Sequence, residues 1–159
     1  MSCYALLAAT ERSMHLSSQT ALRQELYEQP RMLYVVWNEP ASKDLRRWSF
    51  LVTASEQAKY GMLYQIEKNN GAFGGPFLLQ SKPGQVDGLA GRHKIGTIAL
   101  RVEGVFTASS YGGLVLEQVN ESNGRATSQD WVVWMVDCME RNQLIDPGST
   151  EKVKSRVPR

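Results

Sequence analysis

Two segments in which apolar and polar residues alternate, separated by a short polar stretch, limit the possible folds of this chain more than any other feature. Apolar and polar residues alternate in RWSFLVTA (residues 47–54) and again in GMLYQIEK (residues 61–68). A period of two is typical of strands with one buried face, and the polar SEQAKY between them is short enough for a hairpin connection. The pair predicts an antiparallel β-hairpin.

The remaining elements are predicted from local composition. RMLYVVW (31–37) and HKIGTIALRV (93–102) are rich in β-branched and aromatic residues and predict strands. Apolar residues at helical spacing predict a helix in 18–29 that ends before Pro30 and packs on the rim of the fold, a short helix in 112–121 and a long one in 131–145.

The glycine- and proline-rich segment NNGAFGGPF (69–77) predicts a turn. It carries Phe73 and Phe77, which we expect at the lip of a pocket.

Strands clustered together with helices toward the ends favour an α+β fold. We expect a mostly antiparallel sheet packed against a long C-terminal core helix. A chain of 159 residues fits one domain. We predict a mobile N-terminus over residues 1–17, a single globular domain over 18–145, and a mobile basic tail over 146–159, where apolar residues are few.

Composition excludes several classes of function. The net charge is only +2, and no basic stripe with interleaved aromatic residues is present, which argues against nucleic-acid binding. The mildly apolar first residues are too short and too charged to predict a membrane segment. Cys3 and Cys138 provide no disulfide framework, so we expect a cytoplasmic protein.

Neither a metal nor a cofactor is expected. His15 and His93 stand far apart without acidic or cysteine neighbours at ligand spacing. The glycine pairs lack the strand and helix context of a phosphate-binding loop. Cys138 lies inside the apolar segment 131–145, where a thiol lacks the cationic neighbour or helix start that would activate it. We interpret it as a small core residue.

Ser128 and Asp130 stand immediately before and within the first turn of the predicted long helix. A serine there is either a helix cap or a nucleophile facing backbone N–H groups that stabilise an oxyanion, and capping is the more frequent role. Asp130 complements the positive end of the helix dipole. His93 has the ordinary pKa of a general base, but spacing identifies no partner for it, and a surface role is the alternative.

Arg47 and Gln65 lie on neighbouring predicted strands, each beside apolar residues. If the register turns both inward, they imply a polar pocket, because burying them without partners is costly. If they face outward, they are ordinary solvent residues. Sequence alone leaves this register open.

Five segments together resemble the successive blocks of a family of small fungal proteins of uncharacterised function. They are RMLYVVWNEP, RRWSFLV, MLYQIEKNNGAFG, HKIGTI and SQDWVVWMVDCMERNQLI, covering residues 31–145. The block order is similar, by analogy, to permuted papain-like proteins, in which a histidine on a strand precedes a cysteine at a helix start. At the matching positions this chain has Arg47, Gln65 and Ser128 in place of two histidines and a cysteine.

The resemblance implies a cleft that no longer performs cysteine-type acyl transfer, because arginine is not a general base at neutral pH. One hypothesis is a cofactor-independent cyclase or isomerase of fungal specialised metabolism, with Arg47, Gln65, Ser128, Asp130 and His93 as catalytic groups. Its small-molecule ligand would contact the aromatic residues Trp48, Tyr64, Phe73, Phe77 and Trp131. The alternatives are a noncatalytic small-molecule or protein binding module and a degenerate acyl hydrolase or transferase. Sequence does not distinguish a monomer from a homodimer built on an edge strand.

Overall fold

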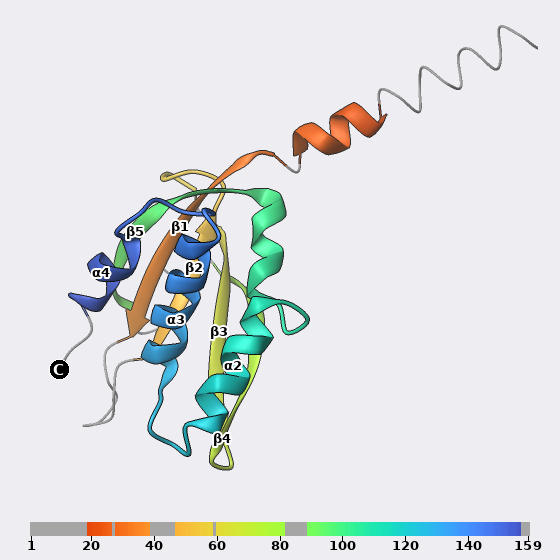
Figure 1. Cartoon of the computed structure of the whole chain (residues 1–159). Helices are drawn as coiled ribbons and strands as arrows, with labels where there is room; N and C mark the ends of the chain where they lie inside the picture. The colour runs from red at the N-terminus through yellow and green to blue at the C-terminus, as the bar shows by residue number, and fades with distance from the viewer. Residues whose placement is uncertain (1–18, 27, 39–46, 59, 82–88, 157–159) are drawn as a thin grey trace, which may run out of the picture.

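Five antiparallel strands form a single sheet in the order β4-β3-β2-β1-β5 (Figure 1). They are β1 (Pro30–Asn38), β2 (Trp48–Thr53), β3 (Gly61–Asn69), β4 (Ala72–Ser81) and β5 (Leu89–Ala99). The computed structural model describes residues 19–26, 28–38, 47–58, 60–81 and 89–156. The predicted α+β class and antiparallel sheet are confirmed.

The predicted hairpin is the pair β2–β3, and its register is now fixed. Phe50 is opposite Tyr64, and Leu51 is opposite Leu63. Alternation then separates the two faces of the sheet, as period-two patterns require. β1 pairs with β2 on one side and with β5 on the other, so the last strand returns to the edge beyond β1.

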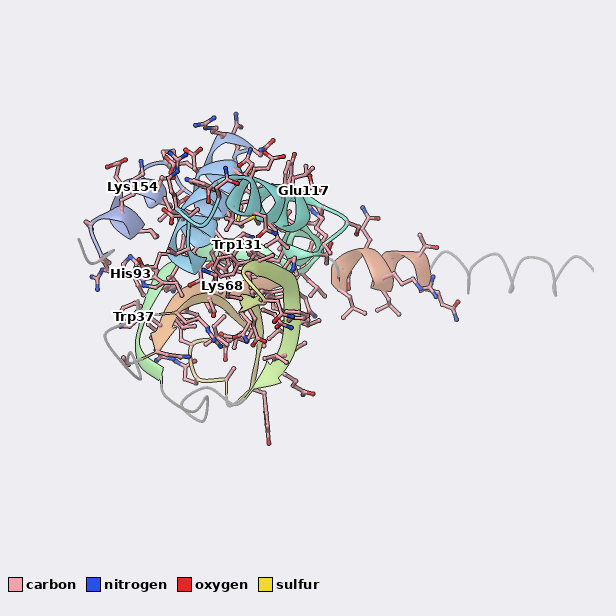
Figure 2. All side chains as sticks on the ribbon, turned by 90° about the horizontal axis from the view of Figure 1, so that it is seen from below. Trp37, Lys68, His93, Glu117, Trp131 and Lys154 are labelled. Atoms are coloured by element: carbon pink, nitrogen blue, oxygen red, sulfur yellow. The ribbon has the colours of Figure 1, made fainter. Side chains whose placement is uncertain are left out.

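Helices cover one face of this sheet. The 3₁₀ helix η1 (Leu100–Phe106) follows β5, and then come α2 (Tyr111–Glu121), α3 (Ser128–Arg141) and α4 (Ser149–Lys154). Figure 1 shows α2, α3 and α4 on the same side of the strands. Trp131 lies between helices and sheet in Figure 2, fully buried, and its ring meets Phe50 edge-on with centroids 5.5 Å apart.

The opposite face of the sheet is apolar as well. Tyr34, Val36, Leu51 and Leu63 form a second buried cluster there. Gln65 lies on this face, because its neighbours Tyr64 and Ile66 belong to the core under the helices. The alternative of an outward-facing, ordinary solvent residue is therefore wrong for Gln65, which is buried.

The C-terminal third differs from the prediction in two ways. The predicted long helix is not confirmed at its full length, because α3 ends at Arg141 and Gln143 adopts a positive φ of 57°. The predicted tail contains α4, in which Val153 is buried. Glu140 of α3 accepts hydrogen bonds from the backbone N–H groups of Gly148 and Thr150, and this anchors α4.

Two other predictions need correction. The segment predicted as a turn is mostly strand β4, because the turn occupies only Asn70 and Gly71, which both have positive φ and join β3 to β4. The predicted N-terminal helix covers residues 19–26 but does not pack on the rim. Every residue in that range is exposed, and in both figures the helix extends away from the sheet. The predicted N-terminal segment 1–17 lies outside the described residues.

Candidate functional site

The residues predicted to form one catalytic site are divided between different parts of the sheet. Arg47 and Gln65 meet at a third residue, Glu67. The Gln65 Nε2 group donates to Glu67 Oε1 at 2.6 Å, and Arg47 Nη1 lies 3.7 Å from the same oxygen. Since the Gln65 amide is already bonded and Arg47 is half exposed, this cluster is a satisfied polar group on the face opposite α3.

The first turn of α3 is closed by a capping box. Thr127 is the N-cap, and its hydroxyl accepts from the Gln129 N–H at 3.2 Å. Asp130 Oδ2 accepts from the Thr127 backbone N–H at 2.7 Å and from its hydroxyl at 3.0 Å. Asp130 is therefore engaged in holding the helix start, as expected for a carboxylate at the third helical position.

Ser128 is the first residue of α3 and is buried. Its Oγ accepts the backbone N–H of Trp48 at 3.3 Å, which joins α3 to the start of β2. In the described part of the chain, no histidine or carboxylate is hydrogen-bonded to this hydroxyl. Serine is a weak nucleophile without such a base, so the contact is structural.

The aromatic residues expected to hold a ligand are mostly core. Trp48, Tyr64 and Trp131 are at most 5% exposed, and the space between hairpin and α3 is filled by their rings and that of Phe50. They are unavailable to a ligand in this arrangement. The expectation of a cleft lined by Trp48, Tyr64 and Trp131 is therefore corrected.

Phe73 and Phe77 lie on β4 and not on a pocket-lip turn. The Phe73 backbone exchanges two hydrogen bonds with the Asn120 side chain, which joins β4 to α2. Phe77 is opposite Gln65 and is exposed. Phe73 therefore joins the sheet to α2, and Phe77 is an exposed residue of the edge strand.

His93 lies on β5 opposite Val35. Burial lowers the pKa of its imidazole, and the positive charges of Arg156 and Lys152 add to this effect. In the described structure it has no hydrogen bond to Ser128. The histidine therefore faces the basic C-terminal segment, and Figure 2 shows it on the side of Lys154.

A different polar cluster forms at the other end of the sheet. The Tyr64 hydroxyl donates to Glu103 Oε2 at 2.9 Å, and Arg31 Nε lies 3.8 Å from Glu103 Oε1. The side chains of Arg31 and Glu103 are 22% and 16% exposed. Burial, and then the negative charge of Glu103, raises the pKa of the Tyr64 phenol far above its ordinary value, so it stays a donor.

Two members of this cluster, Arg31 and Glu103, line a cavity of about 230 Å³. The cavity lies where β1 begins, β2 ends and β3 begins, beside η1. Its polar lining comprises Arg31, Thr53, Tyr60, Gln80 and Glu103, and its apolar lining includes Val52, Met62 and Leu100. It combines opposite charges and apolar walls in one small space, as ligand sites do.

Sequence reasoning missed Arg31 and Glu103. Arg31 was the first residue of a predicted strand, and Glu103 followed a strand predicted to end at Val102. The one available signal was a charged residue beside each strand end, which is common at any sheet edge. Tyr64 is predicted from the sequence as a ligand contact, whereas its hydroxyl donates a hydrogen bond to Glu103.

The described structure gives less support to metal binding, thiol chemistry or a membrane-spanning helix. No group of three or more histidine, cysteine or acidic side chains that could hold a metal ion occurs within the described ranges. Cys138 is half-buried, and burial, followed by the charge of Asp137, raises the pKa of its thiol, which disfavours the reactive thiolate. Among the described helices, none has the length and apolar character needed to cross a bilayer.

No family model, no curated protein and no solved structure matches this chain. The resemblance to small fungal proteins therefore stays a prediction from the sequence blocks.

Proposed function

We propose that this protein is a noncatalytic binding protein for a small zwitterion, an α-amino acid with a short apolar side chain, held in the cavity beside Arg31 and Glu103. The observation that carries the proposal is the state of Arg31. Its side chain is 22% exposed and lines the cavity, and its guanidinium makes no hydrogen bond with any described residue.

A guanidinium that loses water when its side chain is largely buried is stabilised only by well-placed partners. The carboxylate of Glu103 is close, but 3.8 Å is too long for a direct hydrogen bond. Because no described residue accepts a hydrogen bond from the guanidinium donors, they are placed to bind a carboxylate that enters the cavity, in the bidentate geometry that arginine favours.

Glu103 supplies the complementary charge. Tyr64 holds one of its oxygens, and the other faces Arg31, so the carboxylate is fixed in orientation. An α-amino acid carries its carboxylate and ammonium groups on one carbon, which suits a neighbouring guanidinium and carboxylate. A ligand with a single charge would satisfy one of the two groups and leave the other as it is.

The rest of the lining selects a small ligand. Val52, Met62 and Leu100 provide apolar surface. A volume of about 230 Å³ is below the roughly 300–1,000 Å³ of cavities that take drug-sized ligands. A branched aliphatic side chain such as that of valine suits these walls.

The proposal is tested by NMR titration of ¹⁵N-labelled protein with L-valine, isovalerate and isobutylamine. The last two probes keep the branched carbon skeleton but each carry one charge. We expect L-valine to shift the amides of Arg31, Gly61 and Glu103. The singly charged probes should bind more weakly by roughly tenfold or more, since a hydrogen bond to a charged group contributes about 1.5–3 kcal/mol.

Matched variants locate the site. Arg31→Gln should abolish the shifts, whereas Arg141→Gln, on an exposed helix end where Arg141 pairs with Asp137, should leave them unchanged. Equal binding of all three probes would overturn the zwitterion assignment but keep the cavity as a site. Absence of any shift at these amides with every probe would overturn the binding function itself.

A second candidate is a cofactor-free isomerase at the same cavity, because a fixed carboxylate beside a guanidinium also suits proton transfer next to a carbonyl. Glu103 would remove a proton from the carbon beside the carbonyl, Arg31 would stabilise the enolate oxygen, and Glu103 would return a proton to carbon. Incubation of hydroxyacetone with the protein in D₂O distinguishes the two functions. Deuterium incorporation that Glu103→Gln abolishes supports the isomerase, and incorporation at the background rate excludes it for this probe.

A further inference from the structure

β4 leaves one edge of the sheet without a partner strand in the described structure, since β3 is the only described strand that pairs with it. Three consecutive large apolar residues occupy this edge: Phe77, Leu78 and Leu79 are 45%, 52% and 46% exposed. An exposed, apolar edge strand is a template for pairing with another strand, and soluble proteins usually protect such an edge.

The two edges of the sheet are protected differently. β5, at the far edge, carries the charged residues Arg92 and Lys94, and Lys94 forms an ion pair with Glu56. Charges of this kind prevent another strand from pairing. β4 has no charged residue along its whole length. Pro76 interrupts its first half, because proline donates no hydrogen bond, but the segment from Phe77 onward is free of proline.

We propose that two copies of this chain pair antiparallel through β4, with the two-fold axis at Leu78, to form a continuous ten-stranded sheet. The apolar run is symmetric about Leu78. Antiparallel pairing there places Leu78 opposite its counterpart on one face of the sheet, and Phe77 opposite Leu79 of the second copy on the other.

The β4 strand of a second copy can pair with this edge, so no other surface of the protein is needed for the contact. A two-fold interface uses the same patch on both chains, so an uncharged strand meets an uncharged strand and no like charges are opposed. Each copy supplies apolar side chains to both faces of the joined sheet. This inference is independent of the ligand proposed for the Arg31 cavity.

Sedimentation equilibrium of the full chain, from micromolar to submillimolar concentration, tests the proposal. We expect the mass of two chains. Leu78→Lys should give the mass of one chain, because it places two ammonium groups opposite each other at the two-fold axis. Leu78 is half exposed, so the variant should keep the circular dichroism spectrum of the parent.

Two control variants address other apolar surfaces. Leu114→Lys on α2 and Leu22→Lys in the helix 19–26 change leucines that are each 58% exposed, and both variants should remain dimeric. Leu78→Cys, introduced together with Cys3→Ser and Cys138→Ser, should form an intermolecular disulfide, whereas Leu114→Cys in the same background should not. A single-chain mass at every concentration, or a dimer that Leu78→Lys leaves intact, would overturn the proposal.

Discussion

The backbone N–H of Trp48 donates a hydrogen bond to the Oγ of Ser128 at 3.3 Å, so the start of β2 is fixed to the first turn of α3. Both residues are buried. The contact joins two segments that are far apart in the sequence, and it occupies the hydroxyl on which any serine chemistry would depend.

Removing this hydroxyl should destabilise the fold without affecting ligand binding. Ser128→Ala leaves the buried Trp48 N–H without an acceptor, at a cost of about 1–3 kcal/mol. Urea unfolding followed by tryptophan fluorescence measures the change, and Ser155→Ala, at an exposed position after α4, is the matched control. Labelling of Ser128 by a fluorophosphonate would contradict its structural role.

Acid should loosen the contact between α3 and α4. Hydrogen bonds from Thr150 and Gly148 hold the pKa of Glu140 below its ordinary value of 4.5. A carboxyl whose pKa is lowered in the folded state contributes stability above its unfolded pKa and loses it as the pH falls through the folded value. The Thr150 amide resonance should therefore move toward its unfolded position below pH 4.5.

Glu140→Gln provides the comparison for this pH effect, since glutamine cannot titrate. The variant should show weaker α4 docking at neutral pH and a smaller change on acidification. An identical pH dependence in the two proteins would show that another group controls α4.

Gly112 should tolerate no side chain, because a Cβ there would lie 2.2 Å from the Phe106 carbonyl oxygen. Contacts that short require the start of α2 to move away from η1. Gly112→Ala should lower the thermal midpoint by several degrees or more, as overpacking costs about 1–3 kcal/mol. Gly104→Ala, whose added Cβ would meet no other part of the described structure within 4 Å, should unfold close to the parent temperature.

The parts of the fold that were predicted correctly have strong local patterns. Alternation in residues 47–54 and 61–68 identified the β2–β3 hairpin, and helical spacing identified α2. β4 was missed because glycine and proline dominate its first half, although Asn70-Gly71 is itself a hairpin signal. α4 was missed because its short segment has a single buried apolar residue, Val153, and its anchor, Glu140, belongs to another helix.

The candidate site was less predictable than the fold. Arg31 and Glu103 meet only because β1 and η1 lie at the same end of the sheet, and no local pattern encodes that meeting. Tyr64 and Trp131 are aromatic residues of the kind that often contact ligands, yet they fill the core. Side-chain identity alone does not distinguish an aromatic residue that faces a ligand from one that faces a helix.

Calorimetric titration of the wild-type protein with L-valine, beside Glu103→Gln and the exposed control Glu117→Gln, tests the binding function most directly. We expect one site per chain in the wild type and in Glu117→Gln. In Glu103→Gln, which loses the charge facing the ammonium group, affinity should fall by roughly tenfold or more. Equal affinity in all three proteins, or no heat of binding to the wild type, would contradict the proposal.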